Sequence, residues 1–267
     1  MSGLVSHAEE VMGTVVSLTL DPRDPSGRPL DAGAVERMLA EACSVLHEAD
    51  ATFSTYNETS RISRMRRGEL AFEEGGADVE EVIGLCAEAR LASGGWFDAW
   101  SMPGGFDPTG LVKGWAAERA LAAVERGGAR AALVNAGGDL AGYGQHRPGE
   151  PWRIGIRHPW RPDALACVVE MGPRAVATSG SYERGAHLLD PFTGEPARGV
   201  ASATVTGPSL AMADALATAL GAGGEEVLAR IERLPAYEAY LVLEDGRELA
   251  SPGFPFAATS GGAKIGA

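Results

Sequence analysis

The chain has 267 residues and a mass of 27.7 kDa, with 45% hydrophobic and 22% charged residues, so it is long enough to bury the core of one domain. Its 23 Lys and Arg against 36 Asp and Glu give a net charge of −13, which argues against nucleic acid or an anionic membrane as a partner. The sequence contains no signal-peptide pattern and no membrane-spanning apolar run, and its three cysteines are scattered, so we expect a cytoplasmic protein without a membrane anchor.

The first half of the chain predicts one strand and three helices. The β-branched residues at 13–21 favour a strand. Apolar residues at three-four spacing predict helices at about 31–53 and 78–92. A turn-rich loop then leads into a third helix from about Leu111, which ends at the glycine pair Gly127-Gly128.

The second half of the chain predicts mainly strands. Strand patterns separated by turn residues occur at 131–144, 152–157, 166–172, 175–180, 201–207 and 239–245. A long helix from Ser209 and a short helix at 225–231 precede the last of them. Because the helices alternate with hairpin-like runs of strands, we predict an α+β fold with mostly antiparallel strands. We expect one domain over residues 1–255 and a polar, flexible tail at 256–267.

The helix from Ser209 contains one carboxylate, Asp214, among apolar and small residues. A buried carboxylate is costly unless it is paired, protonated or bound to a metal. Thr218 follows four residues later and faces the same way. Carboxylate and hydroxyl oxygens suit Mg²⁺. Taken alone, this helix favours a purely structural role, with Asp214 capping a neighbouring loop and Thr218 bonded to its own helix.

Three other motifs contain candidate functional residues. Asp107 stands where a helix is expected to start, and Lys113 in its first turn could reach a phosphate or lie in solvent. His187 could act as a general base or be a core residue. The paired glycines in residues 135–139, NAGGD, would let a ligand or a strand approach the backbone closely.

Taken together, these motifs resemble one protein family. They are MGT at Met12, STY at Ser54, GWFD at Gly95, DPTGLVKGWAAERA at Asp107, LVNAGGDL at Leu133, AVATSGSY at Ala175, HLLDPFTGEP at His187 and ADALATAL at Ala213. In this order, over residues 12–221, they resemble the ApbE-type FAD:protein FMN transferases. The resemblance implies a T-fold-like α+β core. It also implies Mg²⁺-dependent transfer of the FMN half of FAD onto a Thr or Ser hydroxyl of an acceptor protein, through a phosphoester bond, with release of AMP.

The resemblance also assigns roles to residues of this chain. It implies a metal site made of Asp214, Thr218 and the backbone at Gly110 and Ala217. The residues that it implies for contact with FAD are Met12, Tyr56, Trp96, Phe97, Asp98, Asp107, Lys113 and Leu189. It places His187 where a base would take the proton of the acceptor hydroxyl. The implied partners are FAD and an acceptor protein with a Ser/Thr-containing flavinylation motif.

Two segments are shorter here than in many family members, one between Trp100 and Phe106 and one at residues 183–186. Three alternatives to the transferase therefore stay open. The chain could be a Mg²⁺-dependent FAD pyrophosphatase that forms FMN and AMP, or a non-catalytic FAD-binding protein. It could also be a family relative in which Asp214 is purely structural.

Overall fold

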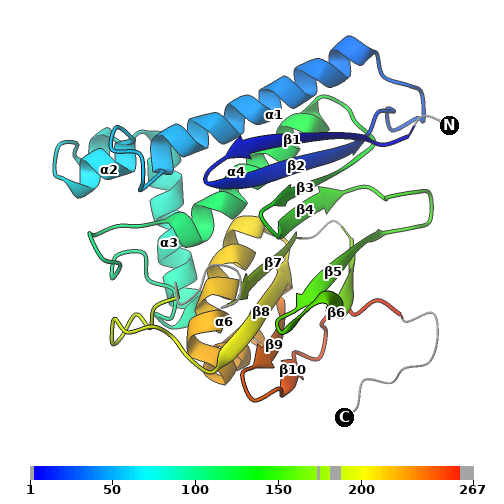
Figure 1. The fold of residues 1–267 in the computed structure, drawn as a ribbon. Helices are drawn as coiled ribbons and strands as arrows, with labels where there is room; N and C mark the ends of the chain where they lie inside the picture. Colours follow the sequence, from blue (N-terminus) through cyan, green and yellow to red (C-terminus); the bar gives the residue numbers. More distant parts are fainter. Residues whose placement is uncertain (1–2, 173–174, 181–187, 259–267) are drawn as a thin grey trace.

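An eight-stranded antiparallel sheet runs through the protein in the computed structural model, which describes residues 3–172, 175–180 and 188–258 (Figure 1). Its strand order is β1-β2-β3-β4-β7-β8-β9-β10, and β5 and β6 form a separate two-stranded sheet. The strands are β1 (Val5–Val11), β2 (Thr14–Asp21), β3 (Ala131–Ala136), β4 (Asp139–Tyr143), β5 (Trp152–His158), β6 (Arg161–Met171), β7 (Ala175–Gly180), β8 (Val200–Gly207), β9 (Glu238–Leu243) and β10 (Glu248–Ala250). The predicted α+β fold with antiparallel strands is confirmed.

Helices cover one face of this sheet. α4 packs on β3 and α6 packs on β7 and β8, while α1 lies over α4 and α3 lies against α6 (Figure 1). The helices are α1 (Ala32–Phe53), α2 (Arg61–Arg66), the short 3-10 helix η1 (Phe72–Glu74), α3 (Ala77–Ser93), α4 (Thr109–Arg126) and α6 (Leu210–Ile231).

The two faces of the sheet belong to different hydrophobic cores, as the period of two along a strand requires. In β7, Ala175 and Ala177 face the helices, whereas Val176 between them packs against the β5–β6 hairpin. In β9, Leu241 faces the helices and Tyr240 faces the hairpin. The sheet is therefore buried between a helical layer and a hairpin.

A close approach of α4 to α6 sets the geometry of the helical layer. A Cβ atom on Gly114 would lie 2.5 Å from the backbone oxygen of Leu210, so only glycine fits at this crossing. Glu118, one turn further along α4, accepts hydrogen bonds from the backbone N–H groups of Leu210 at 2.5 Å and Ala211 at 3.3 Å, and from the Ser209 hydroxyl at 3.1 Å. These contacts fix the first turn of α6 against the middle of α4.

Some elements differ from the sequence-based expectation. The two helices expected around Gly224 are continuous as α6 but are separated by a kink at Gly224, where φ is 55° and ψ is −131°, so the expected break in the helix is present. β1, α2 and β10 were not predicted. Near the C-terminus, the Ala257 N–H donates to the Val168 oxygen at 2.7 Å, so β6 pairs with residues of the segment expected as a tail. Every helix in the described ranges is too short or too polar to traverse a lipid bilayer.

Candidate active site

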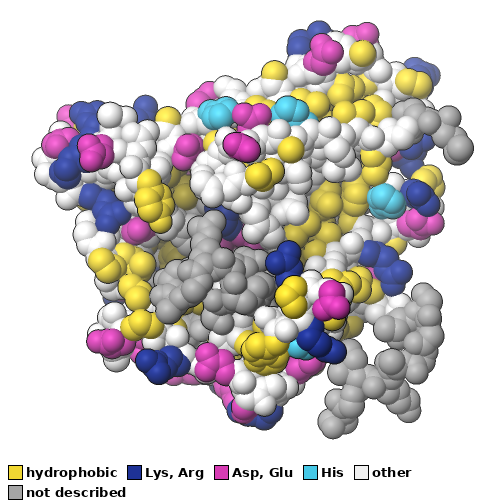
Figure 2. Space-filling view, in the orientation of Figure 1, with side chains coloured by type: hydrophobic (Ala, Val, Ile, Leu, Met, Phe, Trp, Pro, Cys, Tyr) yellow, Lys and Arg dark blue, Asp and Glu magenta, His cyan; other side chains and the backbone are white. Residues whose placement is uncertain are grey.

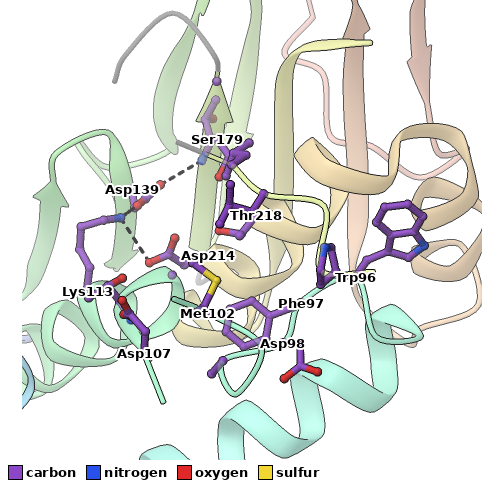
Figure 3. Close-up of a pocket in the computed structure, with 18 of the residues that line it drawn as sticks. Trp96, Phe97, Asp98, Met102, Asp107, Lys113, Asp139, Ser179, Asp214 and Thr218 are labelled. Carbon is purple, nitrogen blue, oxygen red and sulfur yellow. Dashed lines mark hydrogen bonds and ion pairs between the residues drawn. The ribbon is translucent and has the colours of Figure 1, made fainter. Parts of the chain in front are cut away.

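A pocket opens where the first turns of α4 and α6 meet the ends of β4 and β7 (Figure 3). The loop after α3 and the segment around Leu189 close its other sides. The residues that line it are Trp96, Phe97, Asp98, Ala99, Met102, Asp107, Thr109, Gly110, Lys113, Gly137, Asp139, Thr178, Ser179, Gly180, Leu188, Leu189, Pro191, Asp214 and Thr218. Segments from four distant parts of the sequence therefore contribute to one cavity.

α6 brings Asp214 and Thr218 to the floor of this pocket. The helix begins at Ser209, whose side chain accepts a hydrogen bond from the Met212 N–H, and apolar packing buries most of its first three turns. The Asp214 side chain is almost fully buried, and one of its oxygens accepts from the Gly114 N–H at 3.3 Å. Because Thr218 is one turn further on, its hydroxyl lines the same pocket.

Lys113 joins two buried carboxylates. Its ammonium group lies 3.2 Å from an Asp214 oxygen and also contacts a carboxylate oxygen of Asp139 (Figure 3). The other Asp139 oxygen accepts from the Thr178 N–H at 2.9 Å, which ties β4 to β7. The ammonium group offsets the repulsion between the two carboxylates, since buried charges are tolerated only when they are paired.

Sequence reasoning singled out the NAGGD motif but missed the role of its Asp139. The turn between β3 and β4 uses Gly137 and Gly138, with φ of 62° and 103°, and the Asn135 side chain accepts from the Gly138 N–H at 2.8 Å. This tight turn lets Asp139 start β4 with its side chain buried beside Lys113. The sequence feature that could have identified Asp139 is a carboxylate directly after a pair of glycines.

The start of α4 lies against α6 through a glycine. A Cβ atom on Gly110 would lie 3.3 Å from the Thr218 hydroxyl oxygen and 3.3 Å from a ring carbon of Phe97. Asp107 accepts the Thr109 N–H at 3.0 Å and lies 3.6 Å from the Arg66 guanidinium group. The backbone of Gly110 is thus held next to the Thr218 hydroxyl.

The loop after α3 supplies an apolar wall. α3 ends at Gly94, which has a left-handed φ of 69°, and the Phe97 N–H donates to the Ser93 hydroxyl at 3.0 Å. Phe97 is buried, and the half-buried Trp96 meets the Phe192 ring edge to face at 5.0 Å. Asp98, the next residue, is paired with Arg90 at 2.8 Å.

Glu118, at the α4–α6 crossing, has a shifted pKa. Burial raises the pKa of Glu118, and the N–H groups of Leu210 and Ala211 oppose that rise. A carboxylate at the start of a helix also interacts favourably with the helix dipole. Glu118 therefore positions α6, although it does not line the pocket.

The structure gathers most, but not all, of the residues expected to form the site. Trp96, Phe97, Asp98, Asp107, Gly110, Lys113, Leu189, Asp214 and Thr218 line the pocket. Met12, Tyr56 and Ala217 do not appear among the lining residues. Tyr56 is 93% exposed, and Ala217 is buried inside α6. His187 lies outside the described residues.

The turn that contains Met12 nevertheless borders the pocket. Met12 and Gly13 connect β1 to β2 with positive φ angles of 56° and 68°. The next residue, Thr14, has its hydroxyl oxygen 2.6 Å from where a Cβ atom on the pocket residue Gly137 would lie. A ligand larger than the pocket floor would meet this turn.

Comparison with known proteins gives consistent results. The model of the ApbE family matches residues 102–241. A FAD:protein FMN transferase of Rhodobacter capsulatus is 38% identical over 150 residues, which cover 53% of this chain and 28% of that protein. An Escherichia coli K12 protein of the same name is 32% identical over 150 residues, 52% of this chain and 43% of that protein. The matched segment thus spans less than half the length of these relatives.

Solved structures extend the similarity to the whole fold. The flavin transferase ApbE from Vibrio cholerae superposes with a TM-score of 0.81 at 23% identity and covers 95% of this chain and 99% of that chain. The ApbE protein from Thermotoga maritima gives a TM-score of 0.77 at 23% identity, over 93% and 97% of the two chains. At this level of identity the likeness establishes the fold.

Proposed function

The chain belongs to the ApbE family, and we propose that it transfers the FMN half of FAD onto a Ser or Thr hydroxyl of an acceptor protein. The observation that carries the proposal is the convergence of Asp214, Thr218 and the start of α4 in one pocket. In the reaction the acceptor oxygen forms a bond to the phosphorus on the FMN side. The bond from that phosphorus to the bridging oxygen breaks, AMP leaves, and the hydroxyl proton passes to a base.

The donors on the pocket floor fit Mg²⁺. A carboxylate from Asp214, a hydroxyl from Thr218 and the neighbouring backbone at Gly110 and Ala217 are all hard oxygen donors, which magnesium prefers. A Cβ at Gly110 would lie 3.3 Å from the Thr218 hydroxyl, so a larger residue would crowd the place that we assign to the ion. When bound, Mg²⁺ would offset the negative charge that develops on the phosphate oxygens.

The charge of the pocket also calls for a cation. Four of its described lining residues are Asp and one is Lys. Asp98 and Asp107 lie near their own arginines, Arg90 at 2.8 Å and Arg66 at 3.6 Å. Asp139 and Asp214 share the ammonium group of Lys113. A pyrophosphate would meet carboxylates here, and a divalent cation between them would remove that repulsion.

Lys113 would then have two functions. It holds Asp139 and Asp214 in place while the metal is absent, and it supplies positive charge close to the phosphates when FAD is bound. A lysine can do both because its ammonium group sits on a flexible stem and has three donors.

The apolar wall suits the ring systems of FAD. Trp96 and Phe97 lie on the side of the pocket away from Lys113 (Figure 3), and Met102 also lines the pocket. Flat aromatic surface stacks favourably on isoalloxazine or adenine. We propose that one ring lies against Trp96 and Leu189, with the pyrophosphate above Asp214. Tyr56 and Met12 would contact the parts of FAD that extend out of the pocket.

The acceptor hydroxyl needs a base, because an alcohol is a weak nucleophile until its proton is removed. We propose His187 for this role from the sequence alone. His187 directly precedes Leu188, which lines the pocket.

The test is an incubation of the purified protein with FAD and Mg²⁺, with and without an acceptor that carries a Ser/Thr-containing flavinylation motif. AMP is followed by chromatography and covalent flavin by in-gel fluorescence. The transferase predicts AMP and a fluorescent acceptor, both lost on chelation of the metal. AMP and free FMN without labelled acceptor would identify a pyrophosphatase instead. Bound FAD without any AMP would contradict both enzymatic assignments.

A further inference from the structure

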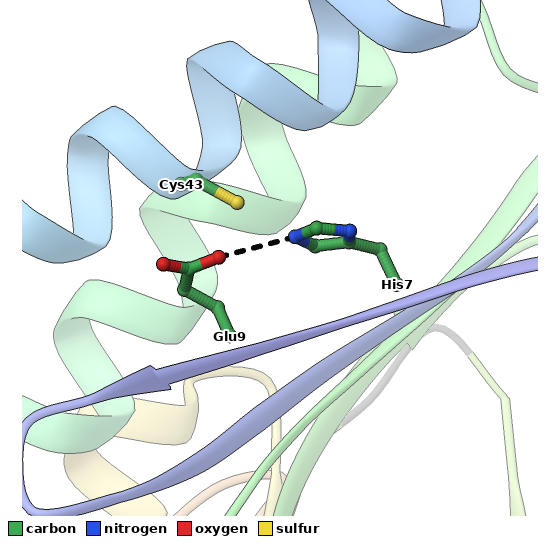
Figure 4. A group of neighbouring side chains, drawn as sticks. All are labelled: His7, Glu9 and Cys43. Carbon is green, nitrogen blue, oxygen red and sulfur yellow. Dashed lines mark hydrogen bonds and ion pairs between the residues drawn. The ribbon is translucent and has the colours of Figure 1, made fainter.

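A second cluster of ionisable side chains lies outside the pocket, between β1 and α1. His7, Glu9 and Cys43 each offer a ligand atom, and these atoms lie within 4.8 Å of one another (Figure 4). One Glu9 oxygen is 3.2 Å from Nε2 of His7, and the other is 2.8 Å from Nε2 of His47. No part of the proposed flavin chemistry uses these residues.

The spacing of these residues follows the periodicity of β1 and α1. His7 and Glu9 are two residues apart on β1, so both face α1, on the side where Val5 and Val11 pack toward the helical core. Cys43 and His47 are four residues apart on α1, which places them on one face of the helix. The inward face of a strand is usually apolar, so two adjacent polar residues there need an explanation.

The spacing of the ligand atoms matches metal coordination. Tetrahedral bonds of about 2.0–2.3 Å to nitrogen, oxygen and sulfur place the ligand atoms about 3.3–3.8 Å apart. The separation of 3.2 Å between His7 and Glu9 is already close to this value. The other pairs of ligand atoms are at most 4.8 Å apart, so rotations of the side chains alone can bring them to coordination distance.

We propose that His7, Glu9 and Cys43 bind a Zn²⁺ ion, and that His47 holds the second oxygen of Glu9. Imidazole nitrogen and thiolate sulfur select zinc over magnesium, because both are softer donors than oxygen. Three protein ligands leave a fourth position for water. A hydrogen bond to a ligating carboxylate orients it, which is the function that we assign to His47.

The cluster is accessible to an ion from solvent. The side chains of His7 and Glu9 are 38% and 27% exposed, and Cys43 is half-buried. Figure 2 shows histidine and acidic side chains reaching the surface over β1 and α1. β1 is an edge strand of the main sheet, so a bound metal would link this edge strand to α1. On binding, the Cys43 thiol loses its proton and the thiolate bonds to the ion.

The first test uses Co²⁺ in place of Zn²⁺ with the purified full chain. A thiolate ligand to Co²⁺ gives charge-transfer absorption in the near ultraviolet. The oxygen-rich pocket cannot give this signal, so the two sites are distinguished. The proposal predicts one equivalent of Co²⁺ with this absorption, displaced by one equivalent of Zn²⁺. An absence of the band, or Zn²⁺ binding no tighter than to a control protein without the cluster, would overturn it.

Four variants assign the ligands. Cys43→Ser, which keeps the size of the side chain, is expected to lose the charge-transfer absorption of bound Co²⁺. Glu9→Gln is expected to lose stoichiometric Zn²⁺ binding, although its amide can still form hydrogen bonds with the His7 and His47 imidazoles. His47→Gln is expected to weaken Zn²⁺ binding by about 10- to 100-fold, as for residues that orient a metal ligand. His158→Gln, on the β5–β6 hairpin, is the matched control and should bind like the wild type.

Thermal unfolding provides a readout that does not depend on spectroscopy. Zn²⁺ should raise the melting temperature of the wild type, since an ion that binds only the folded state stabilises it. It should not raise that of Cys43→Ser, whose fold is checked by circular dichroism. Equal responses of the two proteins would contradict the assignment of Cys43, whether or not the chain transfers flavin.

Discussion

The Lys113–Asp139–Asp214 cluster and the His7–Glu9–Cys43 cluster differ in burial and in donor chemistry. The Asp139 and Asp214 side chains of the first are 4% and 7% exposed, whereas the His7 and Glu9 side chains of the second are 38% and 27% exposed. The first offers oxygen donors with an ammonium group between them, and the second offers nitrogen, oxygen and sulfur.

Under our two proposals, the same protein would hold two kinds of ion site. The buried cluster depends on packing, because its charges are held apart from water by the crossing of α4 and α6. The more exposed cluster depends on the periods of a strand and a helix, which place His7 and Glu9 two residues apart on β1, and Cys43 and His47 four residues apart on α1. Hard donors in the first favour magnesium, and softer donors in the second favour zinc.

The largest expected effect comes from Asp214→Asn. This change keeps the size of the side chain and removes the negative charge that we assign to the metal, so AMP release should fall by about 10³-fold or more. Cys43→Ser is the matched change in the other cluster and should leave flavin transfer unchanged. AMP release measured for both variants checks whether the clusters act independently. Equal losses of AMP release in the two variants would show that the clusters do not act independently.

Lys113→Met should cost the most stability. Without the ammonium group, the repulsion between the buried carboxylates of Asp139 and Asp214 is no longer offset by Lys113, and the free energy of unfolding should fall by about 3 kcal/mol. Added Mg²⁺ should restore part of this loss in the variant. Urea unfolding with and without Mg²⁺ measures both effects, and a variant as stable as the wild type would show that the ion pair is not needed.

Gly114→Ala tests the helix crossing that positions the buried cluster. Its Cβ atom would lie 2.5 Å from the Leu210 oxygen, so α6 must move, and we expect a loss of about 1–3 kcal/mol in stability. Gly84→Ala is the control, because no atom outside its chain neighbours and its own helix backbone lies within 4 Å of its Cβ position in α3. It should stabilise the protein by up to about 1 kcal/mol. Thermal unfolding of both variants compares them directly.

The smallest effect concerns Glu118 and pH. Burial raises the pKa of Glu118 in the folded state above its ordinary value of 4.5, so the folded protein holds this proton more tightly than the unfolded chain. Its contribution to stability is therefore greatest below about pH 4.5 and declines as the pH rises through the folded-state pKa. The stability difference between wild type and Glu118→Gln should shrink or reverse over this range, as urea unfolding at several pH values can show. A pH-independent difference would mean that the shift is absent.

Much of the fold follows from local patterns in the sequence. The three-four spacing of apolar residues located α1, α3 and α4, and the small apolar residues around Asp214 indicated a buried helix. β1 escaped prediction because its inward face carries His7 and Glu9 where an ordinary strand has apolar residues. His7 and Glu9, which interrupt the hydrophobic pattern of this strand, also belong to the second cluster.

The site was less predictable than the fold, because it depends on contacts between distant segments. Asp139 follows a glycine pair, and nothing local shows that strand pairing will bring it to Lys113, which is 26 positions earlier in the printed sequence. Asp214 and Thr218 were recognisable because helix periodicity alone places them on one face. Residues connected by one element can be read from the sequence, whereas residues connected by the sheet cannot.

Thr218→Val gives the most direct test of the central claim that Asp214 and Thr218 bind the Mg²⁺ ion that activates FAD. The substitution keeps the shape of the side chain and removes its hydroxyl. We would measure AMP release from FAD as a function of Mg²⁺ concentration for the wild type and the variant. The account predicts that half-saturation by Mg²⁺ rises at least tenfold, about 1.4 kcal/mol, and that high Mg²⁺ recovers much of the rate. An unchanged dependence on Mg²⁺ would contradict it.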